Sequence, residues 1–236
     1  MADYIDKNIL CQAYIHVELP DNIGEAELET IKQHLIDFAT SRGKFFVYPD
    51  VEVSVEFKNG SLKAYISIAG LIYIAIGQYG SFRSGVDFLH TDIKRLADSL
   101  VSESLFMTKS KYQNIVRTEA RTGVIGSLKT MVDAMNDLDD SLGNIPVDEV
   151  ARRIKNIKED ADVLLTNVRS EQDVINIEDE LSEFAGKLPD RCPHPEDRRP
   201  EDSAVILYQD ALLDFRKTYD KRKKLKIPTR KTNPEV

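Results

Sequence analysis

The residues best suited to chemistry lie in a glycine-rich segment, residues 77–85, that precedes a helical pattern. Backbone N–H groups at the start of a helix favour phosphate or carboxylate, and an arginine can add a bidentate contact. The spacing matches neither a P-loop nor the dinucleotide-binding fingerprint. A tight turn in which one of the serines caps the helix accounts for the same residues. The segment therefore predicts, at most, a weak anion site made of Gly77, Gly80, Ser81, Arg83 and Ser84.

Cysteine and histidine side chains complete no recognisable catalytic or metal-binding motif. Cys192 and His194 could give zinc two ligands, but the other ligands of a structural site are not evident. His90 lies two residues before Asp92, and residues so spaced on a helix point in different directions. Acidic runs at residues 137–140 and 178–180 lack the accompanying pattern of a hydrolase. We therefore predict no catalytic residue, no metal site and no cofactor.

Charge and cysteine content limit the partners and the compartment. A formal net charge of -8 disfavours nucleic acid, except at a basic tail that spans residues 216–231. The two cysteines are far apart and the first eight residues contain no apolar run, which predicts a cytoplasmic protein. The longest apolar stretch, residues 66–77, is shorter than the roughly 20 residues of a membrane-spanning helix. A membrane partner is therefore not expected.

The N-terminal half alternates between apolar and polar residues in several places, which is the pattern of strands. Residues 13–19, 51–57 and 62–68 alternate in this way, and Asn59-Gly60 between the last two is typical of a hairpin. Residues 28–38 have helical spacing, and Gly43 is expected to end that helix. We predict a further strand at residues 71–76 and a second helix over residues 86–100.

The C-terminal half repeats apolar residues at spacings of three and four. The runs cover residues 124–142, 147–168, 174–188 and 205–219, with a helix stop and start between Gly143 and Pro146. Ser170 and Asp173 have the spacing of a helix cap. Such narrow seams contact other helices, either in the same chain or in a second subunit. The interaction seam that we predict consists of Val147, Val150, Ile154, Ile157, Leu164 and Val168.

Together the patterns predict an α+β protein. A small N-terminal β-α-β-β-β-α two-layer module precedes an antiparallel helical bundle or a coiled-coil-like helical array. We place the α+β module at residues 1–110 and a helical hairpin with heptad seams at residues 111–189. A linker follows at residues 190–202, and residues 203–236 hold a C-terminal helix with the basic tail.

Heptad seams without catalytic signatures predict a non-enzymatic interaction or assembly protein. It would form a homo-oligomer, or dock a protein partner, through its helical half. One alternative is an anion- or nucleotide-binding regulatory or enzymatic module that uses residues 77–85. Another alternative is a membrane-acting effector in which residues 66–77 enter a bilayer.

Overall fold

The computed structural model describes residues 9–18, 24–46, 51–58, 62–72, 81–168, 170–195 and 199–219. It shows an α+β protein whose N-terminal strands are followed by helices, so the predicted fold class is confirmed. The chain divides into two compact units. The sheet unit comprises Met1–Asp133 and Asp160–Val174, and the helical unit comprises Ala134–Glu159 and Ile175–Val236.

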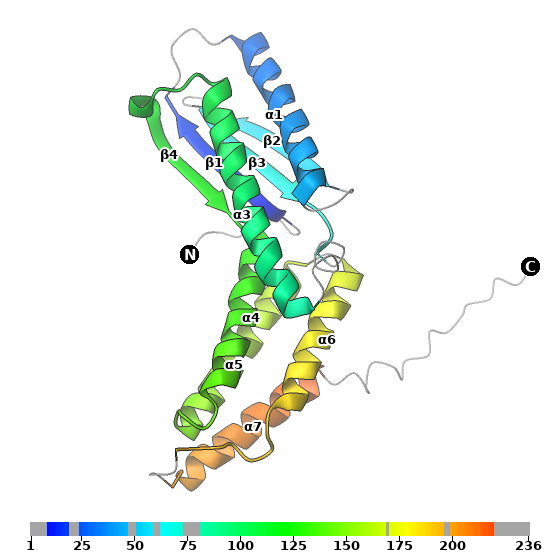
Figure 1. Cartoon of the computed structure of the whole chain (residues 1–236), viewed down its shortest axis with the longest axis vertical. Helices are drawn as coiled ribbons and strands as arrows, with labels where there is room; N and C mark the ends of the chain where they lie inside the picture. The colour runs from blue at the N-terminus through cyan, green and yellow to red at the C-terminus, as the bar shows by residue number, and fades with distance from the viewer. Residues whose placement is uncertain are drawn as a thin grey trace, which may run out of the picture. The chain divides into compact units, whose positions relative to one another are not determined.

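The sheet unit is built on a four-stranded antiparallel sheet (Figure 1). Its strands lie in the order β2-β3-β1-β4, so β1 pairs with both β3 and β4. Two helices alternate with the strands in the pattern β-α-β-β-α-β, which is the split βαβ arrangement of ferredoxin-like folds. The elements are β1 (Ile9–Val17), α1 (Glu25–Phe46), β2 (Glu52–Lys58), β3 (Leu62–Ala69), α3 (Phe82–Met107), the short 3₁₀ helix η1 (Tyr112–Asn114) and β4 (Ile115–Arg121).

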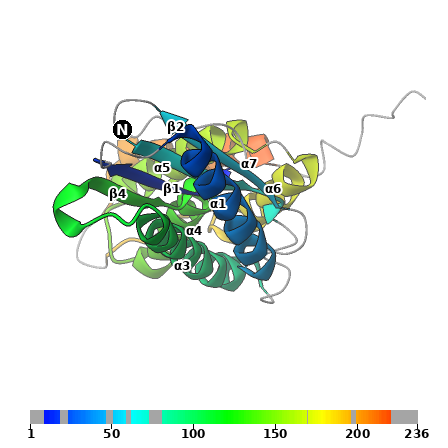
Figure 2. The ribbon, with the colours of Figure 1, turned by 90° about the horizontal axis from the view of Figure 1, so that it is seen from above.

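Both α1 and α3 pack on the same face of the sheet (Figure 2). The pleat of β1 sends Ala13, Ile15 and Val17 toward these helices, and all three side chains are completely buried. The apolar stripe predicted over residues 86–100 is likewise buried on α3. His34 of α1 and Glu103 of α3 lie 2.6 Å apart, from Nε2 to Oε1, and join the two helices. One face of the sheet is therefore the core of this unit.

The fourth strand differs from the one that the sequence predicts. Leu71 and Ile72 are not in a strand, and residues 73–76 lie outside the described residues. The fourth strand is instead β4, which follows α3 and falls within the segment predicted to be a helical hairpin. Beyond Val116 this strand has no alternation of large apolar residues, because it is an edge strand whose side chains are partly or fully exposed. The hairpin pairing of β2 with β3 is confirmed, although residues 59–61 lie outside the described residues.

The prediction that Gly43 ends the first helix is wrong, because α1 continues to Phe46. Gly43 is buried, and a Cβ atom at this position would lie 3.1 Å from Cγ2 of Val51 and 3.6 Å from Cδ1 of Ile68. The absence of a side chain at Gly43 therefore allows α1 to lie close to the sheet.

The predicted cap at Ser170 and Asp173 is confirmed. The Asp173 backbone N–H donates to Oγ of Ser170 at 3.2 Å, at the start of α6 (Glu171–Lys187). The Asp173 side chain is buried, and its Oδ2 accepts a hydrogen bond from the Ile72 N–H at 3.1 Å. This hydrogen bond joins the start of α6 to the residues that follow β3.

The helical unit contains α7 (Asp202–Tyr219) and parts of α4 (Gly123–Ser141), α5 (Val147–Thr166) and α6. The break between residues 142 and 146 separates α4 from α5, as the sequence predicts. Phe184 of α6 and Phe215 of α7 meet edge to face, with ring centroids 6.1 Å apart. Arg216 donates to the carbonyl oxygens of Ala185 and Leu188, which satisfies acceptors at the end of α6. Tyr208, which lies earlier on α7, donates to the carbonyl oxygen of Pro189 beyond the end of α6, so α6 and α7 run antiparallel.

We expect Gly123→Ala to destabilise the protein strongly. Gly123 has φ of 48°, and a Cβ atom there would overlap the carbonyl oxygen of Ile9 and lie 3.1 Å from that of Leu10. Strain and overlap together should lower the free energy of unfolding by about 2–4 kcal/mol in urea denaturation. Gly186→Ala is the matched control, because no atom lies within 4 Å of its added Cβ. Equal stability of the two variants would contradict this expectation.

Candidate functional site

The face of the sheet opposite α1 and α3 carries polar and aromatic side chains. Cross-strand pairing aligns Tyr14 of β1 with Tyr65 of β3 and with Glu119 of β4. Directly paired residues of an antiparallel sheet point to the same face, so the three strands contribute one contiguous set of side chains. We call this set the polar sheet face, and its members are Gln12, Tyr14, His16, Lys63, Tyr65, Ser67, Arg117, Glu119 and Arg121.

Two tyrosines and an arginine form the centre of the polar sheet face. The rings of Tyr14 and Tyr65 have centroids 4.8 Å apart and an interplanar angle of 42°. The guanidinium of Arg121 lies over the Tyr14 ring, with Cζ 5.4 Å from the centroid. Tyr14 is buried and Tyr65 is partly exposed. Such an arrangement places an aromatic surface beside a positive charge, and fixing these side chains costs little conformational entropy.

A hydrogen-bonded chain fixes the arginines of this face. Arg121 Nη1 donates to Oε1 of Gln12 at 3.0 Å, and Nε2 of Gln12 donates to Oγ of Ser67 at 2.8 Å. Glu119 accepts a hydrogen bond from Nε of Arg121 and forms an ion pair with Arg117. Because Gln12 and Ser67 are buried, these hydrogen bonds satisfy polar groups whose burial would otherwise be unfavourable. These contacts hold both arginines in place on the polar sheet face.

The surroundings of Tyr14 determine the protonation of its phenol. Burial raises the pKa of the Tyr14 phenol, and nearby Tyr65 and Glu119 raise it further, against the opposing effect of Arg117. The phenol therefore stays protonated at neutral pH and acts as a hydrogen-bond donor.

The glycine-rich segment is only partly described. Gly77 and Gly80 lie outside the described residues. Ser81 is the N-cap of α3, and its Oγ accepts from the Ser84 N–H at 3.4 Å. Arg83 lies in the first turn of the same helix and is partly buried. The role of a serine as helix cap is thus confirmed, and the predicted anion site stays a prediction.

The six residues of the interaction seam are all buried. Their exposed fractions do not exceed 7% in the single chain, and the largest value belongs to Val168. A partner would therefore have to contact other residues, unless these helices separate. The apolar stretch 66–77 begins in β3, where Ile66 and Ile68 are completely buried, and residues 73–77 lie outside the described residues.

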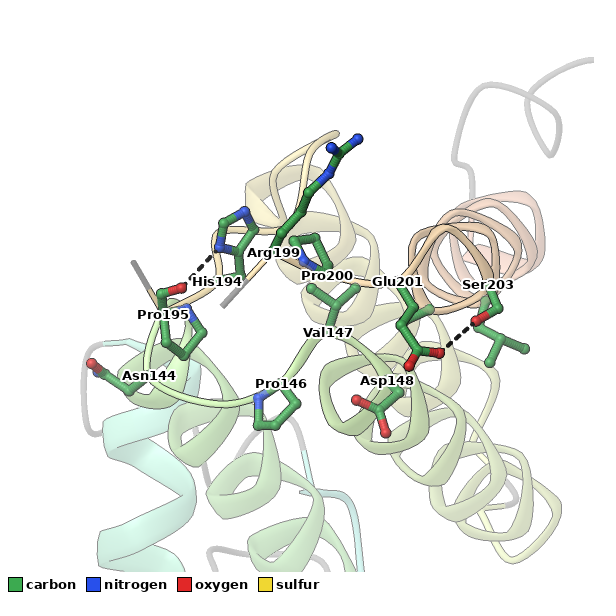
Figure 3. Close-up of a pocket in the computed structure, with 12 residues that line it drawn as sticks. Asn144, Pro146, Val147, Asp148, His194, Pro195, Arg199, Pro200, Glu201 and Ser203 are labelled. Carbon is green, nitrogen blue, oxygen red and sulfur yellow. Dashed lines mark hydrogen bonds between the residues drawn. The ribbon is translucent and has the colours of Figure 1, made fainter. Parts of the chain in front are cut away.

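The helical unit contains an open cavity of about 730 Å³ (Figure 3). Pro146, Val147 and Pro200 supply much of its apolar wall, whereas the side chain of Arg199 extends away from the other labelled residues. Glu201 accepts a hydrogen bond from Oγ of Ser203 at 3.3 Å. The polar side chains of this cavity are not arranged as a nucleophile with its base.

Cys192 and His194 border a smaller adjoining cavity of about 240 Å³. Burial raises the pKa of the Cys192 thiol to about 11, so the thiol is protonated and weakly nucleophilic at neutral pH. His194 Nδ1 lies 3.1 Å from the carbonyl oxygen of Pro195, which fixes that nitrogen as the donor. Among the described residues, no group of three or more metal-ligating side chains lies close enough together to hold an ion.

Two further sequence features have structural roles. Asp92 pairs with Arg95, at 3.4 Å between Oδ1 and Nη1. Arg216, the first residue of the predicted basic tail, also pairs with Asp190 at 2.6 Å in addition to capping α6, and the tail beyond residue 219 lies outside the described residues. None of the helices in the described part of the chain combines the length and apolar character needed to cross a membrane.

The polar sheet face was not predicted from the sequence. The alternation in β1 and β3 already places Tyr14 and Tyr65 on the side opposite the core, and that signal could have identified two members. Pairing with β4 is visible only in the structure, because the residues of β4 do not alternate between buried and exposed. Comparison with protein-family models, curated proteins and solved structures gives no match to this chain.

We expect Cys192 to react slowly with iodoacetamide in the native protein. A thiol pKa of about 11, against an ordinary value of 9.0, lowers the thiolate fraction at pH 8 about a hundredfold. The measurement is alkylation of a Cys11→Ala variant, followed by mass spectrometry in buffer and in urea. Urea should accelerate the reaction about a hundredfold or more. Rapid alkylation in buffer would instead show an activated thiol and reopen an enzymatic role for Cys192 and His194.

Proposed function

We propose that this chain is a non-enzymatic interaction protein that docks a protein partner on its polar sheet face. The observation that carries the proposal is the asymmetry of the sheet, which has two helices on one face and a tyrosine and arginine cluster on the other. Tyrosine and arginine are enriched where interfaces gain most of their binding free energy.

The held geometry of the cluster supports this role. Arg121 is fixed by Gln12 and Glu119, so a partner would immobilise few additional side-chain torsions on binding. The Arg117 side chain is 66% exposed and offers a charged rim beside Tyr14, which is buried, and Tyr65, which is partly exposed. A buried aromatic centre with a charged rim is the usual anatomy of a protein interface.

The proposal places docking on the sheet unit, whereas the sequence pattern favoured the helical half. Burial of the heptad seam in the single chain supports this shift, because a seam already packed offers no free apolar surface. Self-association remains part of the proposal, through a surface other than the seam. Both cysteines are free thiols, which agrees with a location in the reducing cytoplasm.

Quantitative pull-down from native cell extract tests this function. The immobilised full chain should retain a protein partner, and Tyr65→Ala should lower its recovery at least tenfold by removing an interface aromatic. Tyr112→Ala is the matched control, because Tyr112 is 93% exposed on η1, away from the polar sheet face. The two variants should show the same thermal unfolding midpoint within a few degrees.

Three outcomes would contradict the proposal. Equal recovery of the partner by Tyr65→Ala and the wild type would place docking elsewhere. Loss of the partner from Tyr112→Ala alone would move the interface to η1. Retention of single-stranded nucleic acid, detected by nuclease-sensitive absorbance in the eluate, would assign the tyrosine and arginine cluster to base stacking.

A further inference from the structure

The outer edge of β4 is open in the described part of the chain. β4 is the last strand in the order β2-β3-β1-β4, and it pairs only with β1 among the described strands (Figure 1). Its outward N–H and C=O groups can therefore accept another strand. β4 contains neither proline nor glycine, and its charged side chains lie on the polar sheet face. A bulge opposite His16 and Val17 distorts only the start of the strand.

The charges of β4 are self-complementary. The central residues read Arg117-Thr118-Glu119. When two such strands run antiparallel about a twofold axis at Thr118, Arg117 of each copy lies opposite Glu119 of the other. An axis at Arg117 would place two Arg117 side chains opposite each other, and an axis at Glu119 would do the same with two glutamates. Opposite charges stabilise directly facing positions and like charges destabilise them, so the axis at Thr118 is favoured.

The other face of β4 also fits this register. Thr118 and Ala120 point to the side of the sheet that α3 covers, yet both are exposed at this edge. Val116 is 53% exposed, but the pairing with β1 skips it at the bulge, so it lies outside this register. The small side chains of Thr118 and Ala120 leave room for the close approach of a strand.

We propose that a second copy of this chain pairs with β4 and forms one continuous antiparallel sheet about a twofold axis at Thr118. Because the axis is perpendicular to the sheet, the polar sheet faces of both copies lie on the same side. The dimer would thus present two tyrosine and arginine clusters on one surface. This inference specifies the self-association named in the proposed function, and it does not depend on the docking of a partner protein.

Charge reversal tests the dimer with the full chain. In Arg117→Glu all four facing charges of a homodimer are negative, and in Glu119→Arg all four are positive. Each variant should weaken self-association by roughly tenfold or more. Sedimentation velocity over a dilution series measures the dissociation constant. Arg95→Glu makes the same charge change on an exposed part of α3 and should dimerise like the wild type.

Mixing the two variants gives the decisive measurement. An equimolar mixture of Arg117→Glu and Glu119→Arg pairs only opposite charges and should recover the affinity of the wild type. The double variant Arg117→Glu/Glu119→Arg should also dimerise alone, which covers the case in which a single variant fails to fold. A monomeric wild type, single variants that dimerise normally, or failure of both the mixture and the double variant would overturn the proposal. None of these results involves the partner measured by pull-down, so the two proposals can fail separately.

Discussion

Backbone pairing along both edges of β1 is the constraint on which the sheet unit depends. Leu10 to Ile15 are buried, and buried N–H and C=O groups need hydrogen-bond partners. β3 supplies these partners on one edge and β4 on the other. With both edges paired, the pleat sorts the side chains, and apolar residues meet α1 and α3 while Gln12 and Tyr14 turn to the opposite face. The core and the candidate binding surface are therefore two sides of the same strand.

Much of the fold could be predicted because it follows from periodicity. The helices of the C-terminal half match the runs of apolar spacing closely, and the cap at Ser170 and Asp173 follows from two residue types at a fixed distance. β4 could not be predicted in the same way, because an edge strand buries little and carries no apolar alternation. The prediction that Gly43 ends α1 was wrong for a related reason. The small size of Gly43 allows a close contact with Val51, which is evident only in the folded chain.

The candidate site was harder to predict than the fold. Its members come from three strands that are adjacent in space and distant in sequence, and none of them belongs to a motif of fixed spacing. Heptad periodicity favoured the helical half as the interaction surface. Such periodicity indicates which residues are buried, but it does not indicate whether the same chain or a second chain buries them. Arg216 gives a further example, because its charge belongs to a basic cluster in the sequence and to a helix cap in the structure.

The separation of β1 and β4 in the sequence also has a consequence during protein synthesis. The chain must be synthesised and leave the ribosome as far as Arg121 before the whole of β4 can pair with β1. Until then, the nascent chain holds an apolar strand with one unpaired edge. Translation speed between α1 and β4, and the chaperones that meet the nascent chain there, should consequently influence how much of this protein reaches its native state.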